Sequence, residues 1–358
     1  MNREDATMDR KFYLDLAAAG LRMPIGTHLV LHEQAEPEAI LLDGERLGAV
    51  VVETAERFHT PLAVPLMDLA LEKAALLGAC GVPAEEAELY HFTEPPEVPT
   101  DIALTPRMVA SCQAIAHAAR RPGLVAMGMG IGPFSLMTKL VSDPITPVYL
   151  AGSGATAADE PEVALIERLL AIGEATIARY LRAQIEAGAK AIIICEPAAN
   201  TVFLSPKQLA ESYATFDRYV MEPMRRIATQ LAASGVDLVF HDCGELNDGM
   251  VRRFASLGAA MLSFGSSRRL WEDAALVPKD TVLYGNLPTK RFYAKQLTTA
   301  EVAAMAQELV DKMRATGHPF ILGSECDVLS VPGSEREIFG KVEAFMCCTV
   351  PHRGAVLQ

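Results

Sequence analysis

The sequence has no long apolar run. No stretch of hydrophobic residues reaches the roughly 18 that a membrane-spanning helix needs. Residues 1–12 are polar and charged, and they contain no apolar segment of the kind found in a secretory signal. We therefore expect a cytoplasmic protein that does not associate with membranes.

The sequence is also poor in basic clusters. The formal net charge is −13, and no run of five Lys or Arg residues occurs. Binding to the phosphates of nucleic acids requires a basic face. The charge balance therefore argues against a general nucleic-acid-binding function.

Cysteine is present, but its pattern does not suggest disulfides. The seven cysteines are an odd number and show no repeated spacing. In a chain of this length that pattern indicates reduced thiols, as in the cytoplasm.

A glycine-rich phosphate-binding turn is also missing, since Gly26-Thr27-His28 does not have that character. Its absence speaks against a doubly wound nucleotide-binding fold.

Short apolar runs of the kind that form strands recur along the chain. Eight of them predict strands, at residues 27–31, 62–66, 124–129, 191–195, 237–240, 260–264, 281–284 and 319–322. Most are continuously apolar, as expected of parallel strands that are buried on both faces. Their alternation with helical segments predicts an α/β fold, a single (β/α)8 TIM barrel over residues 1–358 with an N-terminal helical extension at 1–22.

The clearest helix begins at Ser205-Pro206, an N-cap followed by proline at the first helical position. Apolar residues then recur at a spacing of three to four until Gly235, and Pro223 predicts a kink within the helix. Two segments, 93–100 and 142–162, are predicted as long loops. The second is either a lid or a solvated surface loop.

Two predicted strands run into residue types that bind metals. His241 and Cys243 follow the strand at 237–240, and Cys326 follows the strand at 319–322. The carboxyl ends of barrel strands share one face, so we expect the three side chains to meet. An imidazole and two thiolates suit zinc, and a catalytic zinc site keeps a fourth position open. The alternative is that the cysteines are buried as small hydrophobic residues.

Other polar residues follow the remaining strands, and each has a structural alternative. Asp68 is either a catalytic carboxylate or the cap of a helix at 69–77. Glu196 leaves a buried strand and must meet a partner or solvent, and we expect a role in the site. Asn286 lies either in the site or in a turn. His28 is either a binding residue or a structural histidine.

These segments together resemble the uroporphyrinogen decarboxylase superfamily, which also contains the methylcobamide:coenzyme M methyltransferases. The resemblance extends from about Pro24 to Thr349. It is carried by residues 130–136, 184–199, 241–244, 285–288 and 320–328. It implies a single (β/α)8 barrel, in agreement with the strand pattern.

Two features of the sequence separate the branches of this superfamily. The decarboxylases carry an N-terminal segment whose two arginines hold the carboxylates of a tetrapyrrole, and residues 21–28 of this chain lack that pair. The methyltransferases use His-x-Cys and a much later Cys as zinc ligands, and His241, Cys243 and Cys326 match that pattern. The residue before the last ligand is usually small, whereas here it is Glu325. Glu325 and Glu196 are therefore candidates for the fourth position.

The resemblance implies a zinc-dependent methyltransferase that moves a methyl group between a corrinoid and a thiol-type acceptor activated on Zn2+. Asp68 and Glu196 would orient the acceptor or support the zinc ligands. The expected corrinoid- and substrate-binding residues are His28, Gly132, Pro133, Phe134, Asn286 and Glu325. Arg268 and Arg269 are candidates for binding an acidic group of the acceptor.

The corrinoid is expected to arrive as methylcobalamin on a separate corrinoid protein. No Asp-x-His-x-x-Gly, the signature of a base-off cobalamin domain, occurs at any of the eight histidines. A homodimer is compatible with the sequence. Two other functions stay open: a cofactor-independent decarboxylase that uses Asp68, and a protein that binds a corrinoid or a thiol without turnover.

Overall fold

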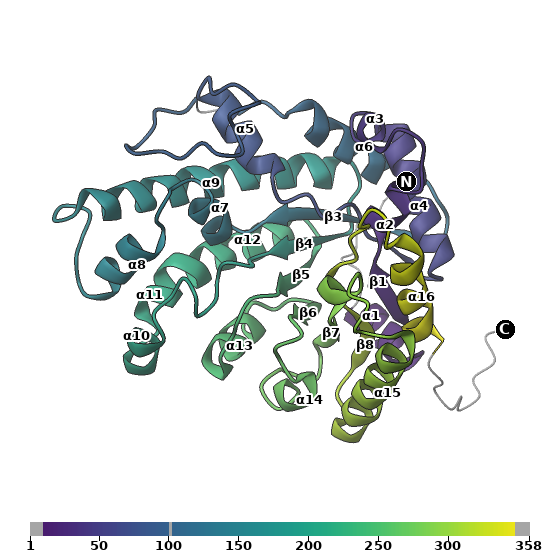
Figure 1. The fold of residues 1–358 in the computed structure, drawn as a ribbon. Coiled ribbons are helices and arrows are strands. Elements are labelled where there is room, and N and C mark those ends of the chain that lie inside the picture. Colours follow the sequence, from purple (N-terminus) through teal and green to yellow (C-terminus); the bar gives the residue numbers. More distant parts are fainter. Residues whose placement is uncertain (1–9, 100–101, 348–358) are drawn as a thin grey trace.

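The computed structural model describes residues 10–99 and 102–347, and its centre is a curled sheet of eight parallel strands (Figure 1). The strands are β1 (Arg22–Ile25), β2 (Leu62–Ala63), β3 (Val125–Ile131), β4 (Ala191–Cys195), β5 (Asp237–Asp242), β6 (Met261–Phe264), β7 (Val282–Leu287) and β8 (Phe320–Asp327). They pair in the order β1-β8-β7-β6-β5-β4-β3-β2. The predicted (β/α)8 barrel is confirmed, although among the described residues no backbone pairing joins β1 to β2.

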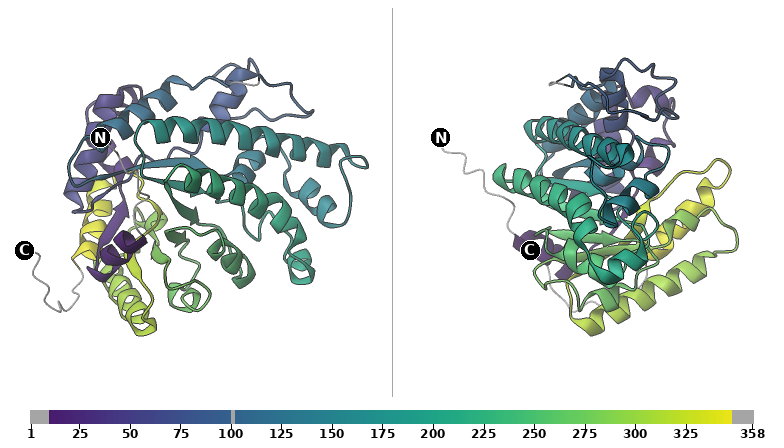
Figure 2. Two further views of the ribbon diagram at one scale, coloured as in Figure 1. Left: turned by 180° about the vertical axis from the view of Figure 1, so that it is seen from behind. Right: turned by 90° about the vertical axis from the view of Figure 1, so that its left-hand side faces the viewer.

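Helices cover the outer side of the sheet, and Figure 2 shows the long α9 and α12 lying side by side there. The helices are α1 (Arg10–Ala18), α2 (Thr27–Leu31), α3 (Pro37–Ile40), α4 (Gly44–Arg57), α5 (Leu71–Ala79), α6 (Pro106–Ala119), α7 (Pro133–Thr138), α8 (Ile145–Gly152), α9 (Pro161–Glu186), α10 (Pro206–Glu211), α11 (Ala214–Phe216), η1 (Asp217–Met221), α12 (Glu222–Ala233), α13 (Asp248–Ala255), α14 (Leu270–Asp273), η2 (Thr289–Arg291), α15 (Thr299–Thr316) and α16 (Glu335–Met346). None of the helices in the described ranges is both long and apolar enough to span a membrane.

The strand predicted at residues 27–31 is wrong, because those residues form helix α2. A short apolar run does not by itself distinguish a strand from a buried helical turn. Here β1 lies upstream, where Arg22 pairs with Leu322 of β8. The N-terminal extension is helical over Arg10–Ala18 and ends before β1, whereas residues 1–9 lie outside the described residues.

The helix predicted from Ser205 to Gly235 begins as expected but is not continuous. The Ser205 side chain accepts a hydrogen bond from the backbone N–H of Gln208, which confirms the cap. The helix then breaks at Ser212 and resumes as α11, a π-helical turn and α12. Pro223 lies inside the unbroken helical stretch 214–233, directly after the π-helical turn Asp217–Met221, so the predicted irregularity is a local π-helical turn. The loop predicted at 142–162 is also wrong, because it contains α8.

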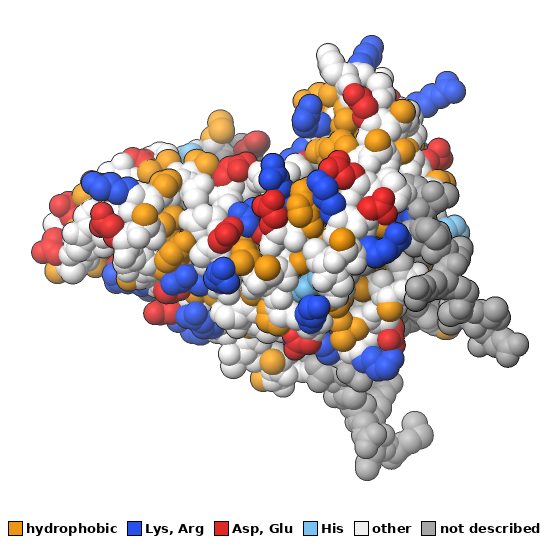
Figure 3. All heavy atoms as spheres, turned by 90° about the horizontal axis from the view of Figure 1, so that it is seen from below, with side chains coloured by type: hydrophobic (Ala, Val, Ile, Leu, Met, Phe, Trp, Pro, Cys, Tyr) orange, Lys and Arg blue, Asp and Glu red, His pale blue; other side chains and the backbone are white. Residues whose placement is uncertain are grey.

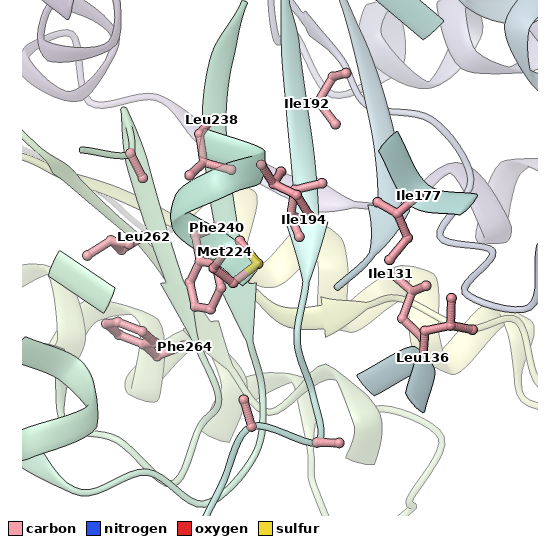
Figure 4. Packing of buried hydrophobic residues seen from close by; sticks show 14 of the residues in the cluster. Ile131, Leu136, Ile177, Ile192, Ile194, Met224, Leu238, Phe240, Leu262 and Phe264 are labelled. Atoms are coloured by element: carbon pink, nitrogen blue, oxygen red, sulfur yellow. The ribbon is translucent and has the colours of Figure 1, made fainter. Parts of the chain in front are cut away.

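The strands alternate between two buried faces. In Figure 4, Ile192 and Ile194 of β4 and Phe240 of β5 point toward the surrounding helices, where Met224 of α12 packs against them. The intervening side chains, such as Val239 of β5, pack together inside the barrel. Because side chains alternate along a strand, His241 lies on the inner face two residues after Val239.

Helix α1 closes the amino-terminal end of the barrel. The Tyr13 hydroxyl donates a hydrogen bond to Oδ2 of Asp237 at 2.9 Å, at the start of β5. Arg10 donates to the carbonyl of Gly258 at 2.8 Å. Tyr13 is fully buried and belongs to the inner cluster of apolar side chains. The opposite, carboxyl-terminal end of the barrel is where the site residues gather.

Strand β3 lacks a strand partner along most of one edge, because β2 is only two residues long. The Gln184 side chain instead accepts from the N–H of Met129 at 2.8 Å and donates to its carbonyl at 2.9 Å. Glu72 accepts from the N–H of Ile131 at 3.1 Å. The Gln184 side chain fits against β3 because residue 128 is a glycine, since a Cβ there would lie 2.2 Å from Oε1 of Gln184. Side chains from α9 and α5 therefore replace the missing strand.

Candidate metal centre

His241 lies near the end of β5 and presents one ring nitrogen without a partner. Its Nδ1 lies 2.9 Å from the hydroxyl of Ser263, the residue opposite it on β6. Its Nε2 is buried and makes no hydrogen bond with the described residues. When Nδ1 donates its proton to Ser263, Nε2 presents a lone pair. Such a buried, unpaired nitrogen is unfavourable unless it has a ligand.

The partners for that nitrogen are two cysteine sulfurs. The ligand atoms of His241, Cys243 and Cys326 all lie within 4.8 Å of one another, as the sequence predicted. A hydrogen bond from the Cys326 thiol holds the pKa of Cys243 below its usual range, and His241 acts in the same direction. The same bond raises the pKa of Cys326. One thiolate is therefore favoured at this site by the protein alone.

The residues present fit a zinc ion. One imidazole nitrogen and two sulfurs are ligand types that zinc prefers, and three protein ligands leave the fourth position open for a substrate. The Ser263 hydroxyl holds the imidazole from behind, as outer hydrogen-bond partners of zinc-bound histidines do. Within residues 10–99 and 102–347 this is the one cluster of three or more His, Cys, Asp or Glu side chains with metal-binding geometry.

Glu196, a candidate for the fourth position, is held by the start of α7. Its carboxylate accepts from the N–H groups of Phe134 at 3.0 Å and Ser135 at 2.8 Å, so both oxygens have partners. Its side chain is fully buried, and burial raises its pKa to about 7. A Cβ at Gly132 would lie 2.1 Å from Cδ of Glu196. Gly132 and the buried Pro133 and Phe134 thus belong to the segment that holds the Glu196 carboxylate in place.

Glu325, the other candidate for the fourth position, connects the ends of three strands. Its Oε2 accepts from the N–H of Ser266 after β6 at 3.0 Å, and its Oε1 accepts from the N–H of Lys290 after β7 at 3.4 Å. Asn286 supports the same region by donating to the carbonyls of Gly265 at 2.7 Å and Arg268 at 2.9 Å. Both residues therefore position the backbone around the cluster.

Asp68 and His28 lie at the mouth with partners of their own. Oδ2 of Asp68 forms an ion pair with Arg107 at 2.6 Å, and Oδ1 accepts from the N–H of Ala70 at the start of α5. The capping role considered for Asp68 is not present, because α5 begins at Leu71 with Ala70 as its N-cap and no side-chain cap hydrogen bond, and Asp68 accepts from the N–H of Ala70, before the first residue of the helix. Nδ1 of His28 accepts from the N–H of Ser330 at 3.0 Å. Burial lowers the pKa of His28 to about 4, so its imidazole is neutral.

Two residues in contact with the cluster or with Glu325 carried no signal in the sequence. Ser263 is a lone serine within an apolar run, and only its register with His241 reveals its role. Lys290 lies in the short helix η2, which the sequence pattern does not predict. Its N–H bonds Glu325, the residue before Cys326, because β7 and β8 are neighbours in the sheet.

Comparison with known proteins agrees with this architecture. The family described as Uroporphyrinogen decarboxylase (URO-D) matches residues 42–335. The chain belongs to the uroporphyrinogen decarboxylase family. This family member also resembles a solved structure, a methyltransferase from Methanosarcina mazei, with a TM-score of 0.67 and 18% sequence identity over 94% of this chain and 97% of the other. A search of curated protein sequences found no match.

Proposed function

We propose that this member of the uroporphyrinogen decarboxylase family is a zinc-dependent methyltransferase that moves a methyl group between a corrinoid and a thiol-type acceptor. The observation that carries the proposal is the cluster of His241, Cys243 and Cys326, with a buried imidazole nitrogen that has no hydrogen-bond partner among the described residues. The fold similarity to a methyltransferase supports the same reaction class.

The three ligands define what the site can do chemically. A zinc ion held there would lower the pKa of a thiol bound at the open position and keep it as a thiolate nucleophile. Ser263 fixes the orientation of the His241 ring, and Glu325 fixes the loops that follow β6 and β7. The oxygens of Glu196 and Glu325 accept hydrogen bonds from backbone N–H groups, and in this proposal the fourth position is left to the substrate.

The corrinoid is proposed to be methylcobalamin delivered by a separate corrinoid protein. The proposal is supported by the absence from the sequence of the motif that marks a base-off cobalamin domain. The net charge of −13 does not by itself define where such a partner docks. On the face seen in Figure 3, acidic and basic side chains are interspersed, so a partner that bound this face would meet both signs of charge.

The metal content of the purified protein tests the proposal. We expect about one zinc per chain, and its loss in Cys243→Ser and in Cys326→Ser. Cys80→Ser is the matched control, because Cys80 is a free, half-buried cysteine at the end of α5 and should leave the zinc content unchanged. The same proteins are then assayed with methylcobalamin and a series of thiols. Methyl transfer should depend on zinc and on both cysteines.

Other outcomes point to the remaining functions. A native protein that takes up no zinc even after reconstitution would overturn the proposal. Activity insensitive to chelators that collapses in Asp68→Asn would indicate a decarboxylase, although Asp68 is engaged by Arg107. Tight binding of a corrinoid or thiol with no methyl transfer would indicate a binding protein.

A further inference from the structure

Met67 brings a third sulfur to the cluster of His241, Cys243 and Cys326. The Cys326 thiol donates a hydrogen bond to the thioether of Met67, and the two sulfurs lie 3.7 Å apart. Two sulfurs that bind one tetrahedral zinc ion at about 2.3 Å each lie about 3.8 Å from one another. The observed separation is therefore the one expected of two ligands of the same ion.

The segment after β2 holds Met67 at the mouth of the barrel. On one side, the buried hydroxyl of Thr27 donates to the carbonyl of Val64 at 2.7 Å. On the other side, the carboxylate of Asp68 is fixed by its ion pair with Arg107. The half-buried Met67 side chain packs against the apolar side chains inside the barrel. The chain is thus held on both sides of Met67, and its side chain lies beside the cluster.

The carboxylates near the cluster are less suited to the fourth position. The oxygens of Glu196 and of Glu325 accept hydrogen bonds from backbone N–H groups. Asp68 is engaged by Arg107. Within the described part of the chain, no further His, Cys, Asp or Glu side chain joins the three ligands. The Met67 thioether offers a soft sulfur donor, a type that suits zinc and monovalent copper.

A thioether has the properties of a replaceable ligand. It is uncharged, whereas an incoming thiolate carries a full negative charge and is attracted more strongly by a divalent cation. The unbranched methionine side chain has three rotatable bonds, so the sulfur can turn away without movement of the backbone. Because a metal-bound Cys326 has no proton to donate, the lone pairs of the thioether are free to bind the metal.

We propose that the Met67 thioether occupies the fourth position of the metal site at rest, and that the substrate thiol displaces it. This rests on the proposed function above. In the exchange, the bond from the metal to the thioether breaks, the bond from the metal to the thiolate sulfur forms, and the thiol proton passes to solvent. The methionine keeps water from the fourth position until the thiol arrives.

The test is X-ray absorption at the zinc edge, on full-length protein in which selenomethionine replaces every methionine. Selenium bound to zinc is then detected directly. We expect a zinc–selenium contact in the resting wild type, and its loss both in Met67→Leu and in the wild type saturated with 2-mercaptoethanol. Met67→Leu conserves side-chain volume and keeps three ligands, so it should still hold about one zinc per chain. Met305→Leu, at an exposed position of α15, is the matched control and should retain the contact.

Each contrary result has its own meaning. A resting protein that holds zinc and binds the thiol without a zinc–selenium contact would overturn this inference and leave the proposed function standing. A contact that persists at saturating thiol would refute the exchange, and one that persists in Met67→Leu would exclude Met67 as its source. A wild-type protein that takes up no zinc would remove the proposed function together with this inference.

Discussion

Glu72 offers a test of how this barrel tolerates buried carboxyl groups. The side chain is fully buried on α5, and Oε1 accepts the hydrogen bond from the N–H of Ile131. Oε2 has no hydrogen-bond partner among the described residues. Burial raises the pKa of Glu72 from 4.5 to about 8, so the carboxyl is protonated in the folded protein at neutral pH. Glu72→Gln has the same shape as the protonated acid and retains the acceptor for Ile131.

The pKa of Glu72 sets the sign and the size of the effect. Between about pH 4.5 and pH 8 the unfolded chain loses this proton while the folded chain keeps it, so the free energy of unfolding falls as the pH rises. The slope is about 1.4 kcal/mol per pH unit, and from pH 5 to pH 7 the loss amounts to about 2–3 kcal/mol. Glu72→Gln has no such proton and should be free of this loss.

The assay is denaturant unfolding at several pH values from 5 to 8, with circular dichroism as the readout. We expect the stability of Glu72→Gln relative to the wild type to increase steadily with pH. The pKa of Glu196 is raised to about 7, and its contribution to the pH dependence of stability is the same in both proteins, so it cancels in the comparison. Glu85→Gln, at an exposed position, is the matched control and should follow the wild type. Parallel pH curves for Glu72→Gln and the wild type would refute the reasoning.

Two further substitutions test the surroundings of the cluster. Gly132→Ala should destabilise the fold by about 3 kcal/mol in the same unfolding assay, because the added Cβ would overlap the buried Glu196 carboxyl. The control is Gly78→Ala on α5, where the added Cβ meets open space, so this variant should be neutral or stabilising. Equal stability in the two variants would contradict the packing described here. Ser263→Ala should weaken zinc binding about 10–100-fold in a chelator competition, because the His241 ring loses the hydrogen bond that orients it; unchanged affinity would show that the ring is held by packing alone.

Much of the fold was predictable because parallel strands buried on both faces leave a strong pattern in the sequence. Seven of the eight predicted strands are observed; the strand at 191–195 has the predicted bounds, and the other six are shifted or resized at their ends. The exception, residues 27–31, shows the limit of the pattern. A short run of apolar and β-branched residues, here with His28 among them, suits a strand or a buried helical turn equally, and the pairing of Arg22 with Leu322 decided between them.

The three ligands were predictable for a different reason. His241, Cys243 and Cys326 lie in or directly after the carboxyl-terminal ends of β5 and β8, which share one face of a barrel, so their convergence follows from the topology. The roles of the carboxylates were not predictable, because their partners are distant in the chain. Glu196 is 62 residues from Phe134, and Glu325 is 59 residues from Ser266.

The barrel and the chemical types of the candidate metal ligands follow from the sequence, because buried periodicity and ligand chemistry are properties of short segments. The tertiary structure alone decided which polar groups remain available around those ligands. Backbone N–H groups from neighbouring loops engage Glu196 and Glu325, whereas Nε2 of His241 has no hydrogen-bond partner among the described residues. Each of these outcomes depends on hydrogen bonds between segments that only the folded chain brings together.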